Sequence, residues 1–293
     1  MDLTKPSELK RLLEAHGLHL SKRFGQNFLV DRAHLMRVVE AAEIGPDDRV
    51  FEIGPGVGTL SVELAERAGR LVAVELDRGL VPVLASVLSP YDNVTIVQED
   101  ALKLNLEPFL QEHLGEPPYK VAANIPYNVT SPILVKLLEA KGLFSSITLM
   151  VQKEVAERLR AKPATPDYGS LTVFAQYFAE VRLVAVVPKG AFFPPPKVDS
   201  AIVHFAPRAE PPVDTPSDAV FLAVSRAAFG QRRKTVANAL TNAPSLHFSR
   251  EDVAAALASA GIDEMRRGET LSLEEIAAVS RALPFDTGTP GEI

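Results

Sequence analysis

The segment NIPYNVTSP, residues 124–132, combines a neutral amide, a proline and an aromatic ring directly after a short apolar run. Asn124 cannot act as a base or a nucleophile near neutral pH, so its chemistry must be hydrogen bonding. Its side-chain oxygen and the backbone carbonyl of Ile125, which precedes Pro126, are two acceptors close together in the chain. Such a pair can hold an amine and stabilise the positive charge that develops when the amine attacks an electrophile. Tyr127 offers a flat face on which a base can stack. For the motif alone, a proline turn with a buried tyrosine is the alternative.

A glycine-rich turn lies earlier in the chain, in the segment FEIGPGVGTL at residues 51–60. Gly54, Gly56 and Gly58 let the backbone turn tightly and approach a ligand, and a helix that opens at Thr59 would present unpaired N–H groups there. The spacing is GxGxG, and it differs from the GxGxxG that binds a dinucleotide pyrophosphate. Taken alone, a bare structural turn explains the loop equally well.

Acidic side chains follow the next two strand-like runs. Glu75 and Asp77 lie at the end of the run at residues 70–76, where a carboxylate can accept hydrogen bonds from both hydroxyls of a ribose. Glu75 is the better candidate, because Asp77 can cap the following helix. Asp100, after the run at residues 93–99, could accept a hydrogen bond from an adenine amino group or cap a turn. Ligand groups at the carboxyl ends of neighbouring strands predict a nucleoside site. The missing pyrophosphate loop favours S-adenosylmethionine over a nicotinamide cofactor.

Seven strand-like runs alternate with helical patterns over the first two-thirds of the chain. Most of them are apolar on both faces, which is typical of a parallel sheet covered by helices on both sides. They are residues 49–54, 70–76, 93–99, 120–125, 146–152, 181–187 and 197–205. The pattern predicts an α/β fold with a doubly wound, mostly parallel sheet. Because a proline-rich connector without a helix joins the last two runs, we expect an antiparallel edge strand.

Capping signals predict several helix starts. Asp31 is the expected N-cap of one helix, and Ser131 followed by Pro132 is the expected start of another. Two pairs with the spacing of a capping box lie in the last quarter of the chain: Ser249 with Asp252, and Ser272 with Glu275.

The character of the sequence changes at APRAEPPVDTPSD, residues 206–218. This stretch has four prolines, mixed charge and no periodicity, which is typical of a linker. Only helical patterns follow it. We therefore expect two domains, an α/β domain at residues 1–208 and a small all-helical domain at residues 209–293.

The composition excludes several classes of function. The chain of 293 residues has no cysteine, so disulfides, thiol catalysis and cysteine-bound zinc are excluded, and its six histidines are scattered without the spacing of a metal site. We find no signal peptide and no apolar run of the roughly 20 residues that span a bilayer, and therefore expect a cytoplasmic protein.

The charge is segregated along the chain. The formal net charge of −6 argues against a nucleic-acid partner, but binding depends on local patches. Bases cluster at several places, and the tightest cluster is Arg232, Arg233 and Lys234.

Together these motifs resemble the ribosomal RNA adenine N6-dimethyltransferase family, of the KsgA type, over nearly the whole chain. KRFGQNFL at residues 22–29 resembles the N-terminal signature of the family, EIGPGVGTL its cofactor loop and NIPYNVTSP its catalytic motif. FFPPPKVDSA at residues 192–201 and FGQRRKTVANAL at residues 229–240 resemble its late motif and its RNA-domain signature. Five motifs in the family's order are far more specific than any one of them.

The resemblance implies a Rossmann-like class I methyltransferase domain followed by a helical RNA-binding domain. It implies that Asn27 and Leu29 join the residues already named in lining an S-adenosylmethionine site: Gly54, Gly56, Glu75, Asp100 and Asn124. It also implies that Phe192 stacks on the target base opposite Tyr127, although the choice between Phe192 and Phe193 stays open. In the helical domain, Arg232, Arg233 and Lys234 would bind RNA phosphates, which position a substrate without reading its sequence.

The implied substrate is a pair of adjacent adenines in the 3′-terminal hairpin loop of 16S ribosomal RNA, within a small ribosomal subunit or its precursor. Each adenine would receive two methyl groups after flipping out of its stack, and we expect the enzyme to act as a monomer without a metal ion. An adenine methyltransferase acting on large-subunit RNA or DNA would share this cofactor site and the catalytic motif. A factor that mainly binds during ribosome assembly is an alternative of another class, and a nicotinamide dehydrogenase is disfavoured by the glycine spacing.

Overall fold

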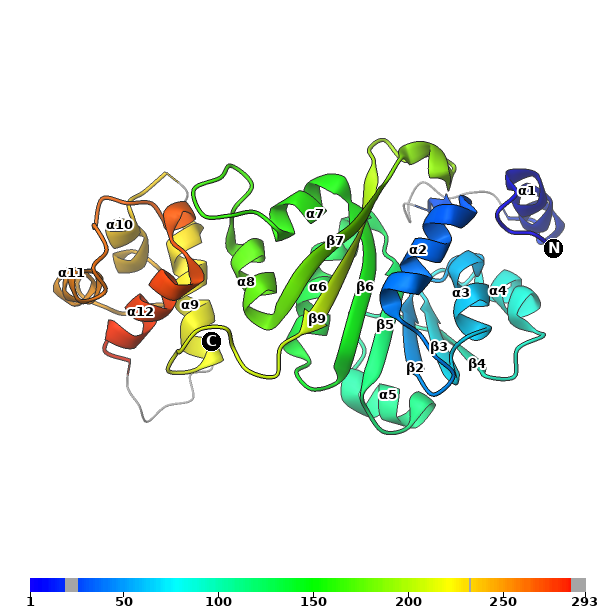
Figure 1. Cartoon of the computed structure of the whole chain (residues 1–293), viewed down its shortest axis with the longest axis horizontal. Helices are drawn as coiled ribbons and strands as arrows, with labels where there is room; N and C mark the ends of the chain where they lie inside the picture. Colours follow the sequence, from blue (N-terminus) through cyan, green and yellow to red (C-terminus); the bar gives the residue numbers. More distant parts are fainter. Residues whose placement is uncertain (19–25, 232, 286–293) are drawn as a thin grey trace. The chain divides into compact units, whose positions relative to one another are not determined.

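A computed structural model describes residues 1–18, 26–231 and 233–285 of the chain (Figure 1). Contacts divide the chain into two compact units. The first consists of Met1–Ala156 and Ala179–Ala209, and the second of Glu157–Phe178 and Glu210–Ile293. Residues 157–178 thus group with the C-terminal helices, while the functional division between residues 208 and 209 stays a prediction.

The first unit is built on a seven-stranded sheet with the strand order β4-β3-β2-β5-β6-β9-β7. Its strands are β2 (Arg49–Ile53), β3 (Arg70–Glu75), β4 (Val94–Gln98), β5 (Tyr119–Asn124), β6 (Phe144–Gln152), β7 (Ala179–Val187) and β9 (Ser200–Pro207). The pairs among β2 to β6 are parallel. All seven predicted strands are present, with ends that differ from the prediction by at most three residues.

The antiparallel pairing that the proline-rich connector predicts is confirmed. β9 runs antiparallel to both of its neighbours, β6 and β7. The antiparallel strand is therefore the last but one, and β7 forms the edge. Since β9 runs against β6, its first residue, Ser200, lies opposite the last residue of β6, Gln152. This register brings the start of β9 to the end of the sheet where the carboxyl ends of the parallel strands lie.

Helices cover both faces of this sheet, as expected for a doubly wound fold. The helices of this part of the chain are α1 (Pro6–Ala15), α2 (Arg32–Ala42), α3 (Thr59–Ala65), α4 (Val81–Leu88), α5 (Leu106–Leu114), α6 (Thr130–Glu139) and α7 (Lys153–Leu159), the last of which crosses into the second unit. Val50 of β2 joins a buried cluster with residues of α2 and α3. The next residue, Phe51, faces the other way and meets Phe109 of α5 edge to face, with ring centroids 6.3 Å apart.

The structure confirms one predicted helix start and corrects another. Asp31 caps α2, because its carboxylate accepts a hydrogen bond from the His34 N–H at 3.0 Å. The predicted cap at Ser131 is wrong by two residues, because the N-cap of α6 is Val129. A short 3-10 helix, η2 (Tyr127–Val129), leads directly into α6, which begins at Thr130 without a side-chain cap. The 3-10 turn before α6 thus takes the place of a side-chain N-cap.

A second, two-stranded sheet joins parts of the chain that are far apart in sequence. β1 (Phe28–Leu29) pairs antiparallel with β8 (Phe192–Phe193), which follows the short 3-10 helix η3 (Lys189–Ala191). Phe28 lies opposite Phe193, and Leu29 lies opposite Phe192. Helix α1 packs nearby, since its buried leucines share an apolar cluster with Phe28. This pairing fixes the segment that contains Asn27 to the end of the sheet.

The second unit is helical, as its composition predicts. It contains α8 (Ser170–Phe178), α9 (Asp218–Gly230), α10 (Val236–Thr241), α11 (Arg250–Ser259), the 3-10 helix η4 (Gly268–Thr270) and α12 (Leu273–Ala282). Both predicted capping boxes are present, at Ser249 for α11 and at Ser272 for α12. The sequence did not indicate α8, which packs on α9 through Tyr177 and Phe221, whose rings stack at 4.2 Å.

Candidate active site

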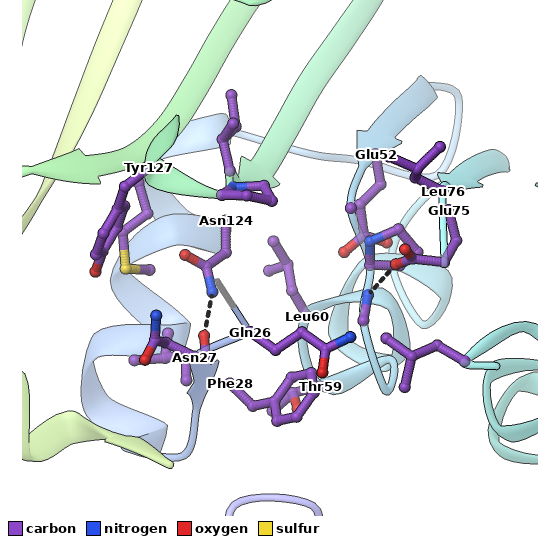
Figure 2. Close-up of a pocket in the computed structure, with 18 of the residues that line it drawn as sticks. Gln26, Asn27, Phe28, Glu52, Thr59, Leu60, Glu75, Leu76, Asn124 and Tyr127 are labelled. Carbon is purple, nitrogen blue, oxygen red and sulfur yellow. Dashed lines mark hydrogen bonds between the residues drawn. The ribbon is translucent and has the colours of Figure 1, made fainter. Parts of the chain in front are cut away.

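A pocket opens in the first unit where β2, β3 and β5 end. It encloses about 1000 Å³ of empty space, including its open mouth. Nine of the residues that the sequence indicates line it: Asn27, Leu29, Gly54, Gly56, Glu75, Asn124, Ile125, Pro126 and Tyr127. Figure 2 shows Asn124 and Tyr127 on one side of the pocket and Glu52 and Glu75 on the other. The carboxyl ends of parallel strands therefore meet at one site, as predicted.

Asn124 is the last residue of β5, and its side chain is held in one orientation. Its Nδ2 donates a hydrogen bond to the backbone carbonyl of Asn27 at 3.1 Å (Figure 2). Because the amide nitrogen is the donor in this contact, Oδ1 is the atom that the side chain offers as an acceptor. Asn27 is fixed in turn by the pairing of the next residue, Phe28, with β8. The amide acts here as an oriented acceptor and not as a base.

The residues after Asn124 form a compact turn. Ile125 is almost completely buried, and the Pro126 carbonyl accepts a hydrogen bond from the Val129 N–H at 3.1 Å. The Tyr127 hydroxyl lies 2.5 Å from the hydroxyl of Ser200. Burial raises the pKa of Tyr127, so its phenol stays protonated at neutral pH. The ring can therefore supply a stacking surface but not a general base.

The glycine loop approaches its neighbours closely. Gly56 has a φ of +63°, and a Cβ atom there would lie 2.8 Å from the ring of Phe28. Its N–H donates to a carboxylate oxygen of Glu75 at 3.0 Å (Figure 2). Glycine is needed at this position for its left-handed backbone and for space. The loop is thus tied to the side chain that the sequence assigns to the ribose.

Glu75 at the end of β3 is 6% exposed and lines the pocket. Besides the Gly56 N–H, it accepts a hydrogen bond from the Asp77 N–H at 2.8 Å. Burial raises the pKa of Glu75, although these two N–H groups oppose the shift. A carboxylate has about four lone-pair positions, so Glu75 keeps acceptor capacity for a ligand hydroxyl.

Asp77 has a structural role, but the expected helix cap is wrong, because the N-cap of α4 is Leu80 and no side chain caps that helix. Its carboxylate accepts from the Gly79 N–H at 2.9 Å and from the Gln26 side chain at 2.6 Å. It closes the turn before α4 and does not belong to the residues that line the pocket.

Two other predicted residues lie apart from the pocket lining. Asp100 accepts a hydrogen bond from the Leu102 N–H at 3.0 Å, which closes a turn after β4.

Phe192 is 3% exposed and packs in the buried cluster that includes Leu29. Phe193, with its side chain on the opposite side of the strand, packs with Phe28. The adenine-binding role of Asp100 and the stacking role of Phe192 stay predictions.

Glu52 is a pocket residue that the sequence did not single out. It lies in β2, is 1% exposed, and its Oε2 has no hydrogen-bond partner among the described residues. Burial raises its pKa to about 8. An acid in the otherwise apolar run VFEIG, residues 50–54, was the available signal, because a charged side chain is rarely buried without a partner. A cation or hydrogen-bond donor in the pocket would supply that partner.

The remaining pocket residues are mostly apolar, and apart from Thr59, the expected start of a helix, sequence patterns give no reason to choose them. They are Gln26, Phe28, Val38, Pro55, Thr59, Leu60, Leu76, Leu80, Asn128, Val129 and Met150. The β1–β8 pairing that brings Phe28 here joins positions more than 160 residues apart, which no local pattern reveals.

The predicted RNA-binding cations belong to the second unit. Arg233 and Lys234 are exposed, between α9 and α10. Arg232 lies outside the described residues. In the described ranges, no group of three or more histidine or acidic side chains is arranged to hold a metal ion. None of the helices described there is long and apolar enough to cross a membrane.

Comparison with known proteins gives the family. The chain is 46% identical over 284 residues to ribosomal RNA small subunit methyltransferase A of Geobacillus kaustophilus, covering 96% of this chain and 97% of that protein. The protein of the same name from Alkaliphilus metalliredigens is 43% identical over 279 residues, covering 95% and 97% of the two chains.

Two solved structures are similar over most of their length. A dimethyladenosine transferase from Plasmodium falciparum has a TM-score of 0.72 at 25% identity, covering 86% of this chain and 95% of that one. The 23S rRNA methyltransferase ErmE has a TM-score of 0.67 at 32% identity, covering 88% and 99%. The family model described as ribosomal RNA adenine dimethylase matches residues 17–283. This chain, with Asn124, Tyr127 and Glu75 lining one pocket, belongs to the ribosomal RNA adenine dimethylase family.

Proposed function

We propose that this protein transfers methyl groups from S-adenosylmethionine to the N6 amines of two adjacent adenines in the 3′-terminal hairpin loop of 16S ribosomal RNA. The observation that carries the proposal is the shared pocket of an oriented amide acceptor, Asn124, a flat ring, Tyr127, and a buried ribose-type acceptor, Glu75. A methyl donor and an adenine need these groups next to each other.

The lining of the pocket fits S-adenosylmethionine in its chemistry. Glu75 can still accept a hydrogen bond from a ribose hydroxyl. Oε2 of Glu52, which has no partner among the described residues, can accept a hydrogen bond or pair with a positive charge. S-adenosylmethionine has both hydroxyls and positive charge, and it supplies an already activated methyl group.

The residues of the chain then have only to hold and activate the amine. An adenine amino group is a poor nucleophile, because its lone pair is delocalised into the ring. Acceptance of its two N–H bonds by Asn124 Oδ1 and the Ile125 carbonyl localises that lone pair and stabilises the developing positive charge. Stacking on Tyr127 aligns the base. Since the charged product nitrogen is acidic, its proton can leave to solvent after transfer, and no general base is required.

The names of the similar proteins support a ribosomal RNA substrate. Relatives at 43–46% identity are called ribosomal RNA small subunit methyltransferase A. A target adenine must leave its stack, which costs a few kcal/mol and is cheapest in a loop. Arg232, Arg233 and Lys234 would contribute by contacting phosphates. A substrate of this kind also supports the cytoplasmic location that the sequence predicts, and a monomer is sufficient because one unit supplies the whole pocket.

The proposal can be tested with small ribosomal subunits that lack these methyl groups. Incubation with the protein and S-adenosylmethionine carrying a tritiated methyl group should label the RNA, and nuclease mapping should place the label on two adjacent adenines near the 3′ end. Up to four methyl groups per subunit are expected. Label elsewhere, or none, would contradict the proposal.

Large-subunit RNA is the second candidate substrate, because ErmE, a 23S rRNA methyltransferase, is 32% identical over 88% of this chain. Offering both unmethylated subunits in one reaction separates the two, since the labelled RNA identifies the target.

A role mainly in assembly is tested with an inactive Asn124→Ala protein. If that protein restored subunit maturation completely, binding rather than methyl transfer would be the main function.

A further inference from the structure

We propose that Ser200 positions the ring of Tyr127 for stacking on the target adenine, and is thus a positioning residue for methyl transfer. This inference rests on the proposed function. The sequence places Ser200 in the predicted strand at residues 197–205 and in the motif FFPPPKVDSA, but it does not indicate a role for this side chain.

The contact between the two residues is short and enclosed. The Ser200 Oγ and the Tyr127 hydroxyl lie 2.5 Å apart, and either oxygen can be the donor. Ser200 is completely buried. Most buried side-chain hydroxyls are hydrogen-bonded, and the partner of the Ser200 hydroxyl is the hydroxyl at the far end of the Tyr127 side chain. The phenol is thereby held at the atom most distant from its own backbone.

Ser200 has a rigid support. It is the first residue of β9, which lies between β6 and β7, and it pairs with Gln152 on one side and Val187 on the other. The preceding residue, Asp199, is fixed as well, because its carbonyl accepts from the Lys153 N–H at 3.0 Å and its carboxylate accepts from the Lys189 N–H at 3.0 Å. The serine hydroxyl is therefore a fixed point at this edge of the sheet.

Tyr127 needs such a fixed point. It begins η2, a single 3-10 turn, and lines the mouth of a pocket in which one face of its ring must stay free for a base. A tyrosine ring moves about two side-chain torsions, and contacts along one face restrain it weakly. A hydrogen bond at the hydroxyl restrains both torsions without covering a face. Burial raises the pKa of Tyr127, so the neutral phenol that this bond needs is kept at neutral pH.

Loss of the bond should slow the chemical step and leave cofactor binding intact. The ring would remain in place but sample more orientations, so the amine would be aligned for attack less often. We expect Ser200→Ala to lower kcat for methyl transfer to small subunits about three- to thirtyfold. The Kd for S-adenosylmethionine should stay within twofold of wild type, because Ser200 does not line the pocket.

A double-mutant cycle tests the route through Tyr127. Tyr127→Phe removes the same bond from the other side and keeps the ring, so it should lower kcat to a similar degree. The double variant should be no slower than the slower single variant, since both changes remove one interaction. If the two losses multiply instead, or if Ser200→Ala has the kcat of wild type, Ser200 does not act through Tyr127.

Ser146→Ala is the matched control. Ser146 is a buried serine of the neighbouring strand β6 whose hydroxyl has no partner among the described residues. Its removal should leave kcat unchanged, which would show that a buried serine-to-alanine change in this sheet is harmless by itself. If Ser200→Ala fails to fold, Tyr127→Phe carries the test alone, and a wild-type kcat for it would overturn the inference.

The failure of this inference is distinguishable from failure of the proposed function. If wild-type protein transfers no methyl group to adenine in ribosomal RNA, the proposed function is wrong. If wild type is active and the cycle shows no coupling, the proposed function stands and the role of Ser200 does not.

Discussion

The side-chain amide of Asn124 donates a hydrogen bond to the backbone carbonyl of Asn27, 97 positions earlier in the chain, at 3.1 Å. The contact joins the end of the central strand β5 to the segment that leads into β1. It explains how a neutral residue can have a defined chemical role. With its nitrogen engaged, the amide cannot flip without losing a hydrogen bond, and its oxygen keeps one direction.

The first prediction concerns Asn124→Ala. Because the side chain contributes an acceptor to the amine and few contacts to the rest of a cofactor, methyl transfer should fall about 100- to 1000-fold, as in the loss of one preorganised polar group. The Kd for S-adenosylmethionine should change by less than about fivefold. Steady-state kinetics and calorimetric titration measure the two quantities.

Asn105→Ala is the control for this change, because Asn105 is exposed and lies outside the pocket. It should retain both activity and affinity. Equal losses of transfer and cofactor affinity in Asn124→Ala would contradict the division of roles.

The sequence predicts the sheet well, and the physical reason is local. The runs that form β2, β3 and β5 are apolar on both faces and bounded by turn residues, so their burial on both sides can be inferred without knowledge of their partners. The same reasoning predicts Glu75 and Asn124 at the strand ends, since parallel strands end at the same edge. The position of β9 between β6 and β7 was not predicted, because strand order depends on packing between distant segments.

The parts of the site that could not be predicted from residue patterns depend on long-range contacts. The pairing of Phe28 with Phe193 and the contact of Tyr127 with Ser200 join segments that share no local periodicity. The roles of Asn27 and Leu29 follow only from the family resemblance. Glu52 could have been noticed, but the burial of its Oε2 without a hydrogen-bond partner is a property of the folded structure.

A second prediction concerns Glu75→Gln. The glutamine keeps the shape of the side chain but has one acceptor oxygen and no charge, while Glu75 accepts the N–H groups of Gly56 and Asp77 in addition to the proposed ribose hydroxyls. Hydrogen bonds to a charged group contribute roughly 1.5–3 kcal/mol each. The Kd for S-adenosylmethionine should therefore rise about 10- to 100-fold in calorimetric titration, while Glu40→Gln on the exposed side of α2 should bind as wild type. An unchanged Kd for S-adenosylmethionine in Glu75→Gln would show that the ribose does not bind to Glu75.

A third prediction concerns Glu52 and the stability of the cofactor-free protein. The ordinary pKa of this carboxyl is 4.5, and burial raises it to about 8 in the folded protein. Between these values the folded chain holds a proton that the unfolded chain releases, so this group lowers the free energy of unfolding as the pH rises from about 5 to 8. Glu52→Gln has no proton to lose. Its Tm should exceed that of wild type by several degrees at pH 8, with the difference shrinking toward pH 5. A difference that grew toward pH 5 would contradict the raised pKa.

The same group should make cofactor binding depend on pH. A cationic ligand favours the ionised carboxylate, so binding below pH 8 requires loss of the Glu52 proton, and affinity should fall by up to about tenfold per pH unit from pH 8 to pH 6. In Glu52→Gln the affinity should be weaker at pH 8 and nearly independent of pH. Titration calorimetry in buffers of different ionisation enthalpy measures the released proton directly. Equal pH slopes in the two proteins would show that Glu52 does not respond to the ligand.

The last prediction concerns Arg233 and Lys234, the exposed cations of the second unit in the predicted RNA-binding cluster. Phosphate contacts release counterions, and each contributes about 0.7–0.9 to the slope of log affinity against log salt. The double change to glutamine should weaken binding to small subunits and reduce this slope by up to about 1.8, while kcat at saturating substrate changes little. Arg226 and Arg250, also exposed in the second unit, are the matched control pair, and their change to glutamine should leave the slope as it is. If both pairs lowered the slope equally, the effect would follow the overall charge of the unit and not a defined contact surface.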